Sequence, residues 1–317
     1  MIISASRRTD VPAYYSEWFI NRVQAGFVYV RNPMNHHQVS RICLSPDVVD
    51  GIVFWTKNPL PMLGRLDELR DYMYYFQFSV TPYGEDVEPG IPSKREAILP
   101  AFKRLSDLIG ADTVIWRYDP ILINEKYSVD YHVRAFSKIA GELCGKTHRV
   151  TISFIDEDYR GVKSNVRELA LSAFTEEMQV ELSARLADIA HSHGLVIDTC
   201  AESLDLSQYG IGHARCINGE LLSKLVGCPL VVVKDKTQRP ECGCVTSIDI
   251  GAYNTCKSGC RYCYANYSAN SVDGNYAGHD PTSPLISGGI GEHDRISERD
   301  ARSCRDMQLR IDGAYSV

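Results

Sequence analysis

The amino-acid sequence predicts an α/β protein whose parallel β-sheet forms a full or partial TIM-like (β/α) barrel. Apolar runs of strand length alternate six times with amphipathic stretches of helical length, a pattern typical of parallel sheets. The regular spacing of these units favours a barrel over an open sheet. Polar residues also gather where each expected strand ends, and barrel enzymes place their active sites at that end of the strands.

The expected elements follow one another in strand–helix pairs. The strands are 2–6, 51–57, 74–81, 113–118, 149–155 and 195–200. The paired helices are 15–25, a helix ending at 70, 94–109, 129–143, 175–193 and 219–225. The strand sequences are mostly continuous apolar runs, as in Gly-Ile-Val-Phe-Trp at 51–55, which indicates burial on both faces of the sheet. The helices are expected from apolar residues that recur every three or four positions.

Composition limits the kind of protein. A chain of 317 residues with 44% hydrophobic and 23% charged residues can form one large α/β domain or two smaller ones. The net charge of −6 argues against general coating of nucleic acid. No apolar run reaches the roughly 20 residues of a membrane span, and the N-terminus does not resemble a signal peptide. We therefore expect no membrane partner.

Eleven cysteines are unusual for a chain of this length. Disulfide frameworks are typical of small secreted domains. Because this chain is long and its thiols are grouped, we expect a cytoplasmic, oxygen-sensitive protein with reduced cysteines.

Three of the cysteines, Cys256, Cys260 and Cys263, form a C-x3-C-x2-C pattern. A compact loop can place three such thiolates on three irons of one [4Fe–4S] cubane, leaving the fourth iron without a protein ligand. No further cysteine follows until Cys304. A zinc knuckle or a disulfide-linked loop is the alternative, although structural zinc requires four ligands.

Residues 256–264 read Cys-Lys-Ser-Gly-Cys-Arg-Tyr-Cys-Tyr. This stretch resembles the cluster loop of the radical S-adenosylmethionine (radical SAM) superfamily. The resemblance implies that the three cysteines hold a [4Fe–4S] cluster whose open iron is chelated by S-adenosylmethionine. Reductive cleavage then yields a 5′-deoxyadenosyl radical that abstracts hydrogen from a substrate. The resemblance also implies an electron donor such as flavodoxin or ferredoxin, and it places Tyr262 against the adenine.

A second resemblance is independent of the cysteines. Residues 88–92, Arg95 and 113–121 are similar to the mid-barrel segment of the spore-photoproduct-lyase-like branch of the superfamily. Thr9-Asp10 and Trp55-Thr56-Lys57 are comparable to strand ends of that branch.

The order of these motifs differs from the superfamily, where the cluster loop comes first. Here it comes last, which indicates a circular permutation. A strand around 247–250 would then lie beside 2–6 and help complete the barrel. The overall layout is similar to an uncharacterised bacterial family with radical-SAM-like cysteines at the C-terminal end.

We divide the chain accordingly into three segments. Residues 1–230 form the βα-repeat barrel, 231–270 form a cysteine-rich segment that completes it, and 271–317 form an irregular tail. The tail is rich in Ser, Asn, Gly and Asp, which favours turns and loops.

The resemblance assigns roles to the polar strand ends. Arg117 is the candidate for the carboxylate of S-adenosylmethionine, since guanidinium groups bind carboxylates bidentately. Ser6, Thr9 and Asp10 are candidates for its ammonium and ribose, and Lys57 and Arg8 for an anionic group of the substrate. The predicted catalytic residues are Arg117, Lys57 and Asp10. The predicted cofactor-binding residues are Tyr262, Ser6, Arg8, Thr9 and Arg117.

Four other cysteines, Cys200, Cys216, Cys242 and Cys244, lie in connected segments. They could hold a second iron–sulfur cluster or a zinc ion. The alternative is that they are free buried thiols that pack like small hydrophobes.

The function that the sequence favours is therefore a radical SAM enzyme acting on a small-molecule or nucleic-acid-derived substrate. One alternative is a radical enzyme that repairs or modifies nucleic acid. Another is a non-catalytic iron–sulfur or zinc protein.

Overall fold

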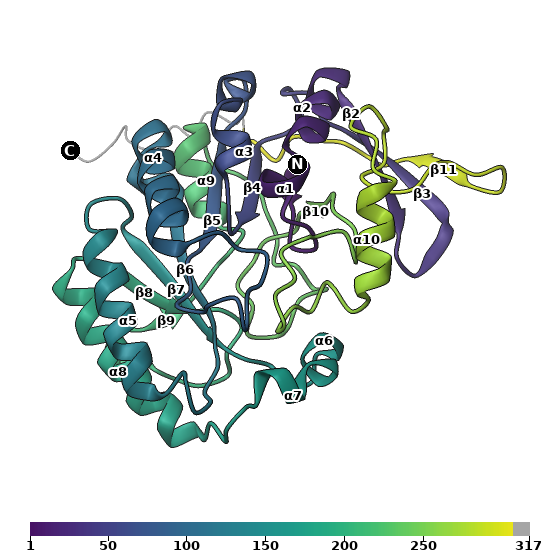
Figure 1. Cartoon of the computed structure of the whole chain (residues 1–317). Coiled ribbons are helices and arrows are strands. Elements are labelled where there is room, and N and C mark those ends of the chain that lie inside the picture. Colours follow the sequence, from purple (N-terminus) through teal and green to yellow (C-terminus); the bar gives the residue numbers. More distant parts are fainter. Residues whose placement is uncertain (307–317) are drawn as a thin grey trace, which may run out of the picture.

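Eight parallel strands form the main sheet of the computed structural model, which describes residues 1–306 (Figure 1). Their order across the sheet is β10-β1-β4-β5-β6-β7-β8-β9. The strands are β1 (Ile2–Ala5), β4 (Gly51–Thr56), β5 (Tyr74–Ser79), β6 (Val114–Ile121), β7 (Arg149–Phe154), β8 (Val196–Thr199), β9 (Gly212–His213) and β10 (Ile248–Asp249). The six expected strands therefore form one parallel sheet, which confirms the predicted α/β class.

The sheet does not close into a complete barrel through hydrogen bonds. Its two edge strands, β9 and β10, contain two residues each, and no strand ladder joins them within residues 1–306. The strand before the cysteine loop does lie where the sequence predicted. Ile248 of β10 pairs with Ile3 of β1, and Asp249 pairs with Ser4.

The larger helices follow the expected strand–helix alternation. They are α2 (Ser16–Ala25), α4 (Leu99–Ile109), α5 (Val129–Glu142), α8 (Glu176–Ser192) and α9 (Gly219–Val226). Hydroxyl N-caps fix the starts of α5 and α8, where Ser128 and Thr175 accept from backbone amides. The helix expected to end at 70 is instead two single turns, α3 (Leu60–Leu63) and η1 (Leu66–Leu69), separated at Gly64. Glycine has a low helix propensity, which accounts for the break.

Side chains along the strands alternate between two apolar layers. Ile3 and Phe54 join the larger core cluster, which also contains side chains of α2, α4, α5 and α8. Ile2 and Val53 face the opposite layer, which is filled by α9 and by side chains between 214 and 245. The face of the sheet that carries Ile2 and Val53 is thus partly covered by α9 and by residues between 214 and 245.

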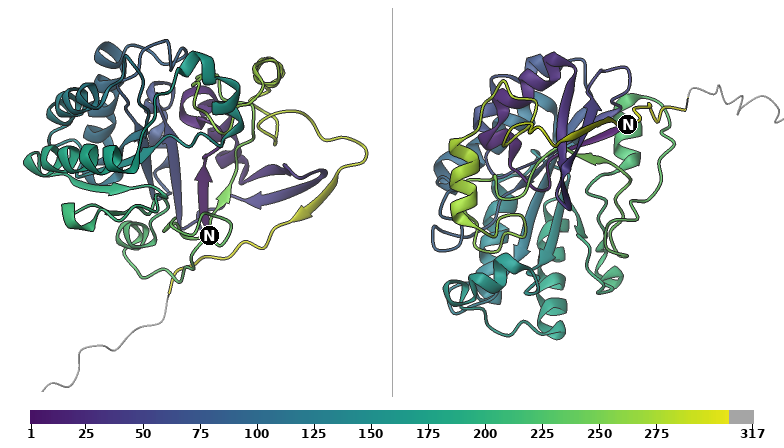
Figure 2. Two further views of the ribbon diagram at one scale, coloured as in Figure 1. Left: turned by 90° about the horizontal axis from the view of Figure 1, so that it is seen from below. Right: turned by 90° about the vertical axis from the view of Figure 1, so that its right-hand side faces the viewer.

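A second, three-stranded sheet was not predicted. It consists of β2 (Phe27–Asn32), β3 (Asn35–Cys43) and β11 (Arg295–Glu298), with β3 in the middle. Figure 2 shows β11, close to the end of the described chain, lying along β3. The segment 271–317 was expected to be irregular, but it contains β11 and most of α10 (Ala269–Ala277). Strand β11 forms because β3 offers a free edge, a long-range contact that local composition does not record. Residues 307–317 lie outside the described part.

The remaining short elements are α1 (Val11–Tyr14), η2 (Lys94–Ile98), η3 (Ala111–Thr113), α6 (Arg160–Ser164), α7 (Val166–Leu169) and η4 (Ser207–Tyr209). In residues 1–306, no helix has both the length and the hydrophobicity that crossing a membrane requires.

The buried ring of His132 predicts a pH dependence of stability. Its Nδ1 lies 2.8 Å from the Tyr118 hydroxyl and its Nε2 lies 2.9 Å from the Leu122 carbonyl oxygen. Burial lowers the pKa of His132 from 6.5 to about 4. The unfolded chain therefore binds a proton at higher pH than the folded chain does. The free energy of unfolding should fall by up to about 3 kcal/mol as the pH drops through this range.

Urea denaturation at a series of pH values checks this expectation. H132Q should lose this part of the pH dependence, whereas H36Q, at an exposed position, should keep it. If the free energy of unfolding changed with pH equally for H132Q and the unsubstituted protein, the assignment to His132 would be contradicted.

Candidate functional site

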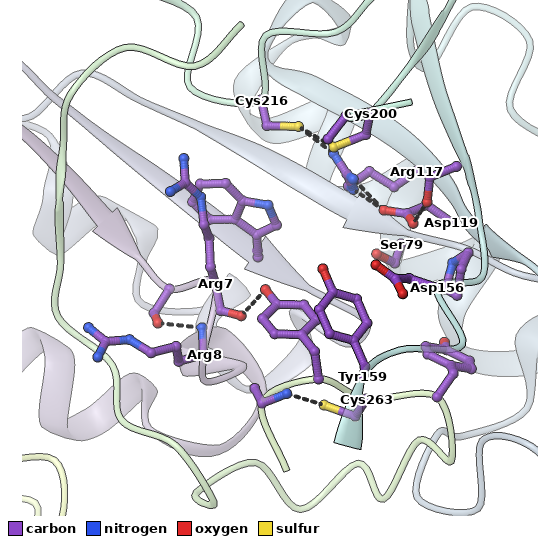
Figure 3. A pocket seen from close by; sticks show the side chains of 18 of the residues that line it. Arg7, Arg8, Ser79, Arg117, Asp119, Asp156, Tyr159, Cys200, Cys216 and Cys263 are labelled. Atoms are coloured by element: carbon purple, nitrogen blue, oxygen red, sulfur yellow. Dashed lines mark hydrogen bonds and ion pairs between the residues drawn. The ribbon is translucent and has the colours of Figure 1, made fainter. Parts of the chain in front are cut away.

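A cavity of about 600 Å³ lies at the carboxyl ends of the parallel strands (Figure 3). Its size is within the range of small-molecule and cofactor sites. The strand ends that the sequence singled out meet here. Those that line the cavity include Ser6, Trp55, Lys57, Ser79, Arg117, Ser153 and Cys200. The C-terminal cysteine loop covers part of the same cavity, because β10 brings it beside β1.

Cys256, Cys260 and Cys263 all line the cavity, and none forms a disulfide. The Ala265 N–H donates to the Cys263 sulfur at 3.4 Å, as is common for metal-ligating thiolates. Two glycines let neighbouring loops approach the cysteine loop. A Cβ on Gly161 would lie 2.0 Å from the Cys263 carbonyl oxygen, and one on Gly90 would lie 2.7 Å from the Ser258 carbonyl oxygen.

The loop thiols are poorly suited to carry charge by themselves. Burial raises the pKa of Cys256 to about 12, and the nearby Asp10 carboxylate adds to this rise. Burial also raises the pKa of Cys260 and of Cys263. A bound metal cation would reverse this preference, because it stabilises the thiolate directly.

The side-chain positions bear on the kind of metal group. Within residues 1–306, no three His, Cys, Asp or Glu side chains form a group that could hold a metal ion. A cubane cluster differs from a single ion because its protein thiolates bind separate irons and stand further apart.

The match to known families can now be stated. Residues 2–265 match the model of a domain of unknown function, DUF1848. The chain belongs to the DUF1848 family. No curated protein matches the sequence. The matched residues of this DUF1848 protein include both the strand ends and the cysteine loop, and so all the residues that line the cavity.

Glu88 is a buried carboxylate beneath the cysteine loop. Its oxygens accept from Lys57 Nζ at 2.8 Å, from Thr81 Oγ1 at 2.7 Å, and from the Lys94 ammonium and the Tyr262 hydroxyl. Burial raises the pKa of such a group, but the two ammonium groups outweigh it and hold the pKa of Glu88 at about 2. Lys57 and Tyr262, both predicted site residues, thus line the cavity while bound to Glu88.

Asp249, at the end of β10, is a second carboxylate on which many donors converge, and its side chain is 17% exposed. It accepts from Ser4 and Ser6 hydroxyls at 2.7 Å, from the Arg7 N–H at 2.8 Å, from Arg8 Nε at 3.1 Å and from the Gly251 N–H at 3.0 Å. Burial alone would raise the pKa of Asp249, but Arg8 and the serine hydroxyls keep it below its ordinary value. The predicted residues Ser6 and Arg8 therefore bind this carboxylate and line the cavity beside it.

Thr9 and Asp10 also line the cavity but are engaged by the chain itself. Thr9 Oγ1 lies 2.7 Å from Thr255 Oγ1 and accepts from the Ala252 N–H at 3.0 Å. Asp10 caps α1 by accepting from the Ala13 N–H at 3.1 Å, and it accepts from the Lys57 N–H at 2.8 Å. Both residues hold strand-end loops in position.

Arg117 lies on the side of the cavity away from the cysteine loop. Figure 3 shows Arg117 with Cys200 and Cys216, and Cys263 on the opposite side. Its guanidinium donates to Cys216 Sγ at 2.8 Å, to Asp119 Oδ2 at 2.9 Å through Nε, and to Gln77 Oε1 at 3.3 Å. The predicted partner of Arg117 was a cofactor carboxylate. In the structure its partners are a thiol and a carboxylate of the protein.

Three important residues were missed by sequence reasoning: Glu88, Asp249 and Arg7. Glu88 belongs to the 88–92 segment named in the second resemblance, but no local pattern showed that two lysines and Tyr262 would bind it. Asp249 directly precedes the cysteine loop in an Asp-Ile-Gly sequence, which was the available signal. Arg7 is next to the predicted Arg8, but its proximity to Cys216 and Cys244 arises only from the fold.

We predict that E88Q destabilises the DUF1848 protein strongly. The substitution leaves the partly buried ammonium groups of Lys57 and Lys94 without their counter-charge. Breaking a fully buried pair costs about 3–5 kcal/mol, which is the upper bound here. Urea denaturation measures the loss. E96Q is the matched control, since Glu96 is exposed on the following helical turn. Equal urea midpoints for the two variants would refute the central role of Glu88.

We also predict that D249N loosens the cysteine loop. An amide cannot accept all the donors that converge on Asp249, and each buried donor left unpaired costs about 1–3 kcal/mol. Cys256, Cys260 and Cys263 should then react faster with a thiol reagent. D300N, at an exposed carboxylate, should leave the labelling rate unchanged. Unchanged labelling in D249N would show that other contacts hold the loop.

Proposed function

We propose that this DUF1848 protein is a radical SAM enzyme. The observation that carries the proposal is the arrangement of Cys256, Cys260 and Cys263. These three thiols, and no fourth from the same loop, line a cavity of about 600 Å³ at the carboxyl ends of parallel strands. Such a set suits a [4Fe–4S] cluster with one iron open to a small molecule.

The donor set is chemically appropriate for this group. When bound, the cluster and S-adenosylmethionine would together supply a 5′-deoxyadenosyl radical that takes hydrogen from the substrate. An electron donor of the flavodoxin or ferredoxin class would provide the reducing electron. The Lys57 ammonium, close to Cys260, would offset part of the negative charge of the thiolates.

Individual side chains support particular parts of the cofactor. Tyr262 lies between Cys260 and Cys263 and lines the cavity, with its hydroxyl bound to Glu88. This contact would hold the ring for packing against adenine. Arg8 also lines the cavity, and its guanidinium stands 5.4 Å from the Tyr253 ring centre. It remains our candidate for binding an anionic group.

The substrate would enter between the two walls of the cavity. Aromatic rings and guanidinium groups line this space, including those of Trp55, Tyr159, Tyr264 and Arg239. Such side chains stack on planar groups and bind anions. The proposed substrate class is therefore a small molecule with a planar group and a negative charge, which includes nucleic-acid-derived molecules.

The test is formation of 5′-deoxyadenosine from S-adenosylmethionine. The protein is reconstituted anaerobically with iron and sulfide and reduced with dithionite. The unsubstituted protein should form 5′-deoxyadenosine, and a variant with Cys256, Cys260 and Cys263 replaced by Ala should form no more than a protein-free sample. A variant with Cys43, Cys144 and Cys228 replaced by Ala should remain active. Equal product from both variants would refute the proposal.

A further inference from the structure

Four thiols outside the cysteine loop meet on the opposite side of the cavity. Cys200 follows β8 and Cys216 follows β9, and their sulfurs lie 3.3 Å apart. Cys244 contributes to the raised pKa of the Cys216 thiol, and Cys242 to that of Cys244, so these thiols lie close to one another. All four cysteines line the cavity, and none forms a disulfide.

Close packing brings these segments together. Gly243, between Cys242 and Cys244, lies so near the chain at 214–215 that a Cβ there would stand 2.8 Å from the Arg215 side chain and 3.2 Å from the Ala214 carbonyl oxygen. The Ile217 N–H donates to Cys244 Sγ at 3.3 Å. The Cys-Gly-Cys turn is thus held against the segment that carries Cys216.

Two guanidinium groups face these thiols. Arg117 is 5% exposed and donates to Cys216 Sγ at 2.8 Å. Cys244 and Cys216 lie close enough to Arg7 to contribute to its raised pKa. Its Nη2 is buried and has no hydrogen-bond partner. A buried donor is rarely left unpaired in a folded protein, so an acceptor is expected at this position.

We propose that Cys200, Cys216, Cys242 and Cys244 hold a second iron–sulfur cluster, with Arg7 and Arg117 as positioning residues. A cluster with four thiolates carries net negative charge, which two guanidinium groups would offset. An inorganic sulfide would accept the unpaired N–H of Arg7.

This cluster would have a different chemistry from the first. Four protein ligands leave no open iron, so it would transfer single electrons instead of binding a substrate. It would gain one electron as a reduced flavodoxin or ferredoxin loses one. This electron-transfer role rests on the proposed function, whereas the metal site itself does not.

Iron and sulfide counts after anaerobic reconstitution test the proposal. The unsubstituted chain should hold about eight irons and the Cys256/Cys260/Cys263→Ala variant about four, all retained by the second site. Replacing Cys200, Cys216, Cys242 and Cys244 by Ser in that variant should remove the remaining iron. Replacing Cys43, Cys144, Cys228 and Cys304 by Ser in the unsubstituted chain is the control. This replacement should change neither the iron count nor the sulfide count.

The outcomes separate this proposal from the proposed function. If the unsubstituted chain holds about four irons and the loop variant holds none, or holds zinc without sulfide, the second cluster is refuted and the radical SAM proposal stands. If the unsubstituted chain holds about four irons and the loop variant keeps them all, the second cluster is supported and the radical SAM proposal fails.

Arg7 offers a further readout in the loop variant. R7Q removes a positive charge that stabilises the reduced cluster, so the midpoint potential should shift to a more negative value with the iron count unchanged. An unchanged potential would refute the role of Arg7.

Discussion

The carboxylate of Asp249 is the contact on which the site depends. It ends β10, and it accepts hydrogen bonds from Ser4, Ser6, Arg7 and Arg8, which belong to β1 and the loop after it. One group therefore joins β10 to β1 and the loop after β1 at the rim of the cavity. Because the cysteine loop begins a few residues after Asp249, its position follows from that of β10. Without this junction, the three loop thiols would have no fixed relation to the other strand ends.

Glu88 serves a comparable purpose on the other side of the cysteine loop. A buried carboxylate is costly unless cations compensate it, and here Lys57 and Lys94 do so. The Tyr262 hydroxyl completes the set, which ties the loop to the ends of β4 and β5. The loop is therefore held at two points by charged groups, the buried Glu88 and the partly buried Asp249. Glycines at 90 and 161 let the surrounding backbone approach it closely enough for these contacts to form.

The cavity thus has two sulfur-bearing walls of different character. The loop wall presents three thiols beside a lysine–glutamate network. The opposite wall presents four thiols beside Arg7 and Arg117. Arg117 contacts Cys216 directly, so its charge acts on that wall rather than on the loop. The two walls enclose aromatic and cationic side chains, where a substrate would be exposed to both.

The sequence by itself determined the features that are written locally. Apolar runs defined six strands of the parallel sheet, and cysteine spacing defined the cysteine loop, because both signals lie within a few residues of chain. It also indicated that β10 would lie beside β1, through the altered order of the motifs. Only the tertiary structure decided the partners of Glu88, Asp249, Arg7 and Arg117, the sheet formed by β2, β3 and β11, and the open edges of the main sheet. These depend on contacts between residues far apart in the chain, and no local pattern records which distant donors a buried charge will meet.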